Sequence, residues 1–194
     1  MMKISRVAMA TITLAGMAGL SAAQPKADPK APGADMSAMK MPTAPQALAD
    51  MSKMMTGTWK CTGKSIGMDM KTMEDMTGTM KQKLEMDGFW MHSAFDAKMG
   101  KMPFHFDSYE TVDAKNGWRR IMVSSGGEYS VGTSDGPKDN KIDWMIESHS
   151  SMGSGHGKDH IDWSDMKAGV KAMGEWSMDG GKTFNKIYEM ICKK

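Results

Sequence analysis

Only two cysteines and four leucines occur among the 194 residues, and neither charge sign dominates. The 25 basic and 23 acidic residues leave a formal net charge of +2 and are interspersed. A chain without a basic patch lacks the electrostatic footprint of a nucleic-acid-binding protein, so we expect no nucleic-acid partner. No nucleophile elbow, Cys–His pair or carboxylate pair of defined spacing is present. We therefore do not expect an enzyme.

The first 23 residues have the layout of a secretory signal peptide. Lys3 and Arg6 are followed by the uncharged, mostly apolar run 7–20 and by small residues up to Ala23. The run is short for a membrane span, and no cysteine stands at the cleavage site to carry a lipid. We expect cleavage after Ala23 and a periplasmic or secreted protein without a membrane span; an uncleaved anchor is the alternative.

Two further segments follow the expected leader. Residues 24–44 hold four prolines, many alanines and no aromatic residue. Such a segment cannot bury enough apolar surface to offset its ordering entropy, which predicts a disordered linker. Residues 45–194 contain all the tryptophans, tyrosines and phenylalanines and have the length of one domain.

Periodicity predicts one short helix and then strands. The stretch 45–55 begins with proline and spaces its apolar residues as an amphipathic helix does. After it, apolar and polar residues alternate, which is typical of strands with one buried and one wet face. The clearest alternating apolar sets are Met80, Leu84 and Met86, and then Ile142, Trp144 and Ile146.

Turn dipeptides recur at short intervals through this domain. Asp-Gly and Asn-Gly pairs supply the positive φ angles of tight hairpins. No helical stretch between them is long enough for a parallel crossover, which favours an antiparallel up-and-down barrel or a sandwich of about nine to ten strands over an α/β fold. The turn signals are Asp87-Gly88, Met99-Gly100, Asn116-Gly117, Gly126-Gly127, Asp135-Gly136, Ser154-Gly155 and Asp179-Gly180.

Two stretches resemble a known family. A helix that enters "GTW" at 57–59 and then a first strand is similar to the calycin superfamily, in which the tryptophan lies at the barrel floor. The stretch "DGFWMHSAFDAKMGKMPFHFDSYETVDAKNGWRR" at 87–120 resembles the bacterial domain-of-unknown-function family 1579. The resemblance covers about 55–192 and implies an exported, calycin-like up-and-down β-barrel, but no particular activity.

The two cysteines, Cys61 and Cys192, fall in the first and last expected strands. An exported protein with two cysteines favours one disulfide. In an up-and-down barrel the first and last strands are neighbours, so the fold hypothesis predicts that these two residues pair. Two free buried thiols, or a metal or redox pair, are the alternatives.

Methionine is abundant, with 26 residues. Thioether sulfur favours Cu(I), so the dense cluster at 68–76 is a candidate soft-metal site for copper. Alternatively, methionine replaces leucine as core filler, or exposed methionines act as oxidant traps. The candidate metal ligands are Met68, Met70, Met73 and Met76.

The histidines offer weaker candidates for chemistry. Glycines and serines surround His156 and His160, which predicts a solvated loop over 149–160 rather than a metal site. His105 and Asp107 alternate with phenylalanines, which favours a wet strand face over acid–base catalysis. His92 lies between aromatic positions and could line a cavity or ligate haem, although no second feature supports haem.

The leading hypothesis for function is the binding of a small, mostly apolar molecule inside the barrel. Copper binding and a filled, non-binding envelope scaffold are the alternatives, and no other cofactor is expected. The expected cavity-lining residues are Trp59, Met80, Leu84, Phe104, Phe106, Trp144 and Tyr188.

Overall fold

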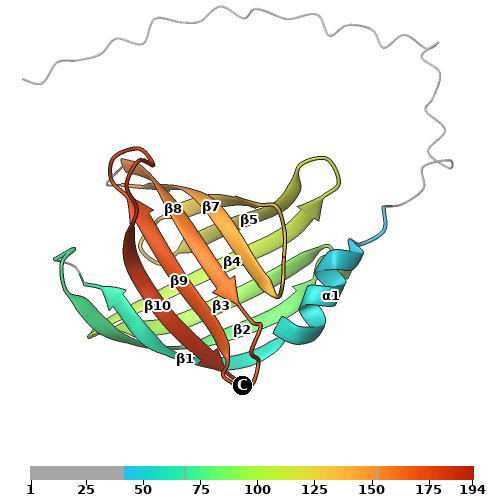
Figure 1. Ribbon diagram of the computed structural model, residues 1–194, viewed down its shortest axis with the longest axis horizontal. Coiled ribbons are helices and arrows are strands. Elements are labelled where there is room, and N and C mark those ends of the chain that lie inside the picture. The colour runs from blue at the N-terminus through green and yellow to red at the C-terminus, as the bar shows by residue number, and fades with distance from the viewer. Residues whose placement is uncertain (1–41, 68, 152) are drawn as a thin grey trace, which may run out of the picture. The chain divides into compact units, whose positions relative to one another are not determined.

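Ten antiparallel strands close into a barrel in the computed structural model, which describes residues 42–67, 69–151 and 153–194 (Figure 1). Each strand pairs with the next along the chain, and the last pairs with the first, which confirms the predicted up-and-down barrel. The elements are α1 (Gln46–Met55), β1 (Gly57–Ile66), β2 (Met73–Glu85), η2 (Met86–Gly88), β3 (Trp90–Met99), β4 (Met102–Asp113), β5 (Gly117–Ser124), β6 (Tyr129–Ser134), β7 (Lys141–Ser150), β8 (Gly153–Asp162), β9 (Val170–Ser177) and β10 (Asn185–Lys193).

The predicted leader at 1–23, and the linker at 24–44 up to residue 41, lie outside the described residues. Within the barrel, period-two alternation decides which side chains are buried. On β7, Ile142, Trp144 and Ile146 are buried while their neighbours along the strand are exposed. The predicted polar and apolar faces of this strand are therefore confirmed.

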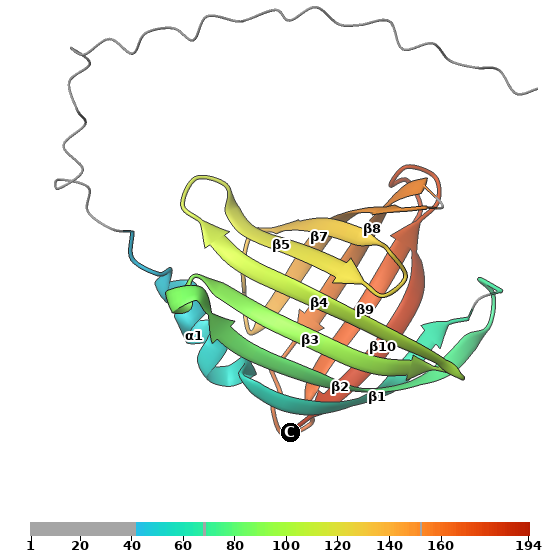
Figure 2. The same cartoon turned by 180° about the vertical axis from the view of Figure 1, so that it is seen from behind.

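Helix α1 covers one end of the barrel (Figure 2). Its buried residues Leu48, Met51 and Met55 belong to the same core as Trp59, the first large inward side chain of β1. The indole Nε1 of Trp59 donates to the backbone oxygen of Met55 at 2.8 Å, and the ammonium of Lys194 lies 4.6 Å from the centre of the indole ring. The tryptophan thus fixes the helix to the barrel floor.

Cys61 and Cys192 lie directly opposite each other on β1 and β10 and form a disulfide. The bond joins residues 131 positions apart and closes the barrel at its seam. In the chain-entropy model, closing a loop of that length stabilises the fold by about 5 kcal/mol. The predicted pairing is confirmed.

The predicted loop over 149–160 is wrong, because Gly153–Asp162 forms the strand β8. A Cβ added at Gly155 would lie 2.1 Å from the Trp176 side chain, and one at Gly157 would lie 3.2 Å from it. These glycines make room for an inward tryptophan on β9 and do not mark a turn. Sequence patterning cannot distinguish the two uses of glycine.

The predicted inward position of Met86 is also wrong, since β2 ends at Glu85. Met86 begins the short turn η2, has a positive φ of 49°, and is 60% exposed. The strand ends at Glu85, although the alternation of apolar and polar residues in the sequence continues to Met86. By contrast, the turn predicted at Asn116-Gly117 forms, with φ 75° at Gly117.

Candidate functional site

A cavity of about 320 Å³ lies inside the barrel, away from α1. Its lining includes Ile66 at the end of β1, Met99 at the end of β3 and Glu128 just before β6, whereas α1 leads into the start of β1. The volume is near the lower end of the range for ligand pockets, roughly 300–1,000 Å³.

A larger hollow of about 900 Å³ lies on the outer face of β1 to β4. Several of its side chains, including Lys60, Thr62 and Lys98, are exposed. A molecule in this hollow would remain in contact with water and would bury little apolar surface. The interior cavity is therefore the better candidate for a binding site.

The cavity walls are mainly aromatic rings and thioethers. The rings of Phe95 and Phe106 lie 5.3 Å apart, and those of Phe104 and Phe106 lie 6.0 Å apart, both tilted as aromatic pairs prefer. Flexible thioethers fill irregular gaps and adapt to varied apolar shapes. The methionines that line the cavity are Met76, Met99, Met122 and Met190.

One wall carries a buried ion pair. Arg120 on β5 donates through Nη2 to Oδ2 of Asp159 on β8, and the Tyr188 hydroxyl donates to Oδ1 of the same carboxylate at 2.9 Å. The Arg120 guanidinium also lies 4.9 Å from the centre of the Trp144 ring. Asp159 and Tyr188 line the cavity, whereas Arg120 and Trp144 do not.

The ionisation of this wall follows from burial and from neighbouring charges. Burial raises the pKa of Glu110, which also lies inside the barrel, although Arg120 opposes the shift. Burial also raises the pKa of the Tyr188 hydroxyl well above 10, and Asp159 adds to the effect. Burial opposes the charge on Arg120, but the attraction of Asp159 and Glu110 raises its pKa. The wall therefore holds an Arg120–Asp159 ion pair beside a neutral phenol.

The rest of the polar lining consists of hydroxyls and of two further acidic residues, Glu128 and Glu175. Ser148 donates through its hydroxyl to Oε1 of Glu128, which stands between β5 and β6. Ser65 and Ser130 are 7% and 2% exposed and line the same cavity. Within the described part of the chain, neither hydroxyl has a hydrogen-bond partner, so each has bonding capacity free for a ligand.

The structure divides the seven predicted lining residues into two groups. Phe104, Phe106 and Tyr188 line the cavity. The other four, Trp59, Met80, Leu84 and Trp144, face inward but pack in the core, outside the cavity lining. Strand alternation identifies the inward face but not the position along the barrel axis, so the sequence could not separate these groups.

The predicted copper ligands are distributed over different environments. Met68 lies outside the described residues. Met70 is 56% exposed in the turn between β1 and β2, while Met76 is 5% exposed and lines the interior cavity. Met73 and Met76 occupy opposite faces of β2, because they are three positions apart, an odd number, along one strand. The arrangement of these thioethers does not favour a shared soft-metal site.

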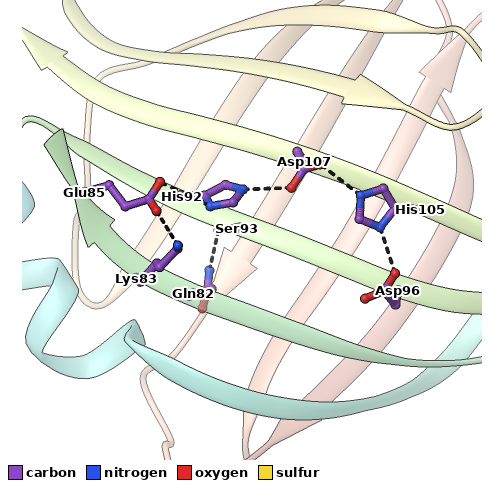
Figure 3. A network of polar contacts seen from close by, with 8 residues as sticks. All are labelled: Gln82, Lys83, Glu85, His92, Ser93, Asp96, His105 and Asp107. Carbon is purple, nitrogen blue, oxygen red and sulfur yellow. Dashed lines mark hydrogen bonds and ion pairs between the residues drawn. The ribbon is translucent and has the colours of Figure 1, made fainter.

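A second polar cluster lies on the outer face of the barrel (Figure 3). His92 contacts Asp107 at 2.8 Å and Glu85 at 3.3 Å, and His105 contacts the other oxygen of Asp107 at 2.9 Å. His105 also contacts Asp96 at 2.8 Å. The hydrogen bonds that the His105 imidazolium donates to Asp107 and, second, to Asp96 raise the pKa of His105. Acids and imidazoles thus alternate across three strands and link β2, β3 and β4.

The placement of His92 overturns its suggested role inside the barrel. His92 is on the outward side of β3, stacked on Tyr109 with ring centres 4.5 Å apart. It therefore cannot line the interior cavity or ligate haem there. The prediction that His105 and Asp107 occupy the wet face of β4 agrees with the structure, since Phe104 and Phe106 point inward.

No protein-family model matches this chain, and no curated protein matches its sequence. Among the described residues, no helix is both long enough and apolar enough to cross a membrane. In the same residues, no three His, Cys, Asp or Glu side chains form a group that could hold a metal ion. The geometry of the cavity therefore carries the functional argument.

Sequence patterning did not identify the polar residues of the barrel interior. Arg120 and Glu110 are 6% and 8% exposed, although each stands in a strand segment with many polar neighbours. One signal was available: Arg120 shares its strand face with Trp118 and Met122 at a spacing of two. A charged residue on the same strand face as large apolar residues indicates a charged side chain that points into the barrel and therefore requires a partner there.

Proposed function

We propose that the protein binds a small, mostly apolar molecule inside the barrel. The observation that carries the proposal is the cavity of about 320 Å³, whose walls are mainly aromatic and thioether groups. A few polar groups, chiefly Asp159, Tyr188 and Glu128, interrupt those walls and would orient a ligand. This combination is typical of ligand sites and differs from a filled core.

The test is a fluorescence titration with N-phenyl-1-naphthylamine, a neutral apolar probe. Met122→Trp places a large ring in the cavity, so we expect it to weaken probe binding at least tenfold. Its matched control is Ile121→Trp, because Ile121 is the preceding residue of β5 and is 45% exposed on the outer face. Absence of probe binding, or equal binding by both variants, would favour a barrel that acts only as a scaffold.

We further propose that the chain is exported and is a member of domain-of-unknown-function family 1579. The support is the leader-like pattern of residues 1–23 and the resemblance carried by 87–120. A disulfide at the barrel seam agrees with an oxidising compartment. Mass spectrometry of the protein from an exported fraction tests the localisation: we expect a chain that begins at Gln24 and carries one disulfide.

A further inference from the structure

The charge that faces the cavity is negative. Three acidic residues, Glu128, Asp159 and Glu175, belong to the lining, and no lysine, arginine or histidine is part of it. Arg120, the buried cation among the described residues, lies outside the lining and is held by Asp159. An anionic ligand would therefore meet negative charge without a free positive partner.

The three acidic residues of the lining differ in their partners, and Glu175 contacts the imidazole of His160 at 3.5 Å. Asp159 pairs with Arg120 and also accepts the hydroxyl hydrogen of Tyr188. Glu128 accepts a hydrogen bond from Ser148, and no basic side chain of the described residues forms an ion pair with it. Among the described residues, Glu128 is therefore the lining carboxylate without a basic contact partner, and it is only partly buried.

A free hydroxyl beside Glu128 provides independent support for a polar contact at this place. Ser130 stands two residues after Glu128, lines the same cavity, is 2% exposed, and has no hydrogen-bond partner for its side chain within the described part of the chain. Ser65, which also lines the cavity, lies on β1, five strands away from β6 on the opposite wall. Buried polar groups are normally hydrogen-bonded, so unpartnered hydroxyls in a cavity wall indicate a site that a ligand or ordered water completes. An ammonium group can donate to hydroxyl oxygens and to a carboxylate at the same time.

We propose that the cavity binds a protonated amine with an aromatic or aliphatic body, with its ammonium group at Glu128. This inference rests on the proposed function and names the ligand class of the same site. The apolar body lies among Phe106, Met122 and the neighbouring thioethers. The ammonium forms a charge-assisted hydrogen bond with Glu128, which is roughly twice as strong as a neutral one. A partly desolvated site increases the selectivity for the cation.

The experiment compares three ligands of one shape: 4-phenylbutylamine, 4-phenylbutan-1-ol and 4-phenylbutanoate. Each competes with N-phenyl-1-naphthylamine at pH 7, where the amine is cationic and the acid anionic. We expect the amine to bind at least tenfold more tightly than the alcohol, and the carboxylate to bind most weakly. Tenfold corresponds to about 1.4 kcal/mol.

Glu128→Gln keeps the shape of the side chain and removes its charge. We expect it to abolish the preference for amine over alcohol and to leave the affinity for the alcohol within twofold. Glu147→Gln is the matched control, because Glu147 is an outward, 57% exposed carboxylate next to Ser148 on β7. The control makes the same change in net charge and should retain the preference.

The outcomes separate this inference from the proposed function. Equal binding of amine and alcohol, or an amine preference that survives Glu128→Gln, overturns the amine proposal while the cavity remains a binding site. Loss of the preference in Glu147→Gln as well would also overturn it, because general charge would then explain the selectivity. If neither the probe nor any of the three ligands binds, the proposed function fails together with the inference.

Discussion

Arg120 on β5 reaches across β6 and β7, inside the barrel, to form an ion pair with Asp159 on β8. Gly132 on β6 leaves the path open: a Cβ added there would lie 3.4 Å from both the Arg120 Cβ and the Trp144 ring. The pair therefore joins strands that are not neighbours in the sheet. It also holds the carboxylate that Tyr188 contacts in the cavity wall.

Breaking this pair from one side should be costly. Arg120→Met leaves Asp159 buried with only the Tyr188 hydroxyl as partner, and we expect the free energy of unfolding to fall by about 3–5 kcal/mol. The double variant Arg120→Met/Asp159→Asn removes the stranded charge, so it should lose less than the sum of the two single changes. Urea unfolding measures all three, and simple additivity would contradict a direct interaction.

Glu110 should make stability depend on pH in the direction opposite to an ordinary salt-bridged acid. Its pKa is raised by burial, so the protonated form is favoured in the folded protein. The contribution of Glu110 to the free energy of unfolding is fully present below the ordinary pKa of 4.5 and is lost as the pH rises through its raised pKa in the folded protein. We expect Glu110→Gln to remove this loss and to stabilise the protein at pH 7 relative to the parent.

The measurement for Glu110 is urea unfolding at a series of pH values from 4 to 8. The difference between Glu110→Gln and the parent should shrink toward pH 4. Glu189→Gln changes a 51% exposed carboxylate paired with Lys186. In this control the free energy of unfolding should depend on pH almost as it does in the parent. If the free energy of unfolding changed with pH equally in the parent and in Glu110→Gln, Glu110 would not titrate in this range.

The Cys61–Cys192 bond should account for a large part of the stability. Replacing both cysteines with serine is expected to lower the free energy of unfolding by about 2–5 kcal/mol, because the unfolded chain regains the freedom of a 131-residue loop. Thermal unfolding with and without reductant checks the origin of the effect. Reductant should destabilise the parent and leave the double-serine variant unchanged.

The outer-face cluster predicts a titration that nuclear magnetic resonance can follow directly. The pKa of His105 is raised above 6.5 by its hydrogen bonds to Asp107 and Asp96. The stability from these contacts is fully present below pH 6.5 and is lost as the pH rises through the raised pKa. Asp107→Asn should lower the pKa of His105, measured from its ring protons.

A control for this titration is Asp143→Asn, since Asp143 contacts His160 on β8 and has no contact with His105. The pKa of His105 should not change in that variant. An unchanged pKa in Asp107→Asn would mean that Asp107 does not stabilise the imidazolium.

Much of the fold could be predicted because its signals are local. Alternation in β7, the helix before β1 and the Asn116-Gly117 turn each follow from a few adjacent residues. The candidate site could be predicted only in part: Phe104, Phe106 and Tyr188 line the cavity, but Trp59 and Trp144 do not. The two groups differ in their position along the barrel axis. The alternation of residues along a strand predicts which side chains point inward, but not how far along that axis they lie.

The sequence by itself determined that the domain is built from antiparallel strands and which side chains of a strand such as β7 face inward. Together with the resemblance to an up-and-down barrel, it also determined the pairing of Cys61 with Cys192. Those features depend on backbone preferences and on the two-residue period of a strand. Only the tertiary structure decided that Gly155 and Gly157 lie in a strand beside Trp176, and that Arg120 meets Asp159. These contacts join residues on different strands across a closed interior, and they form only when the curvature of the barrel brings the strands together.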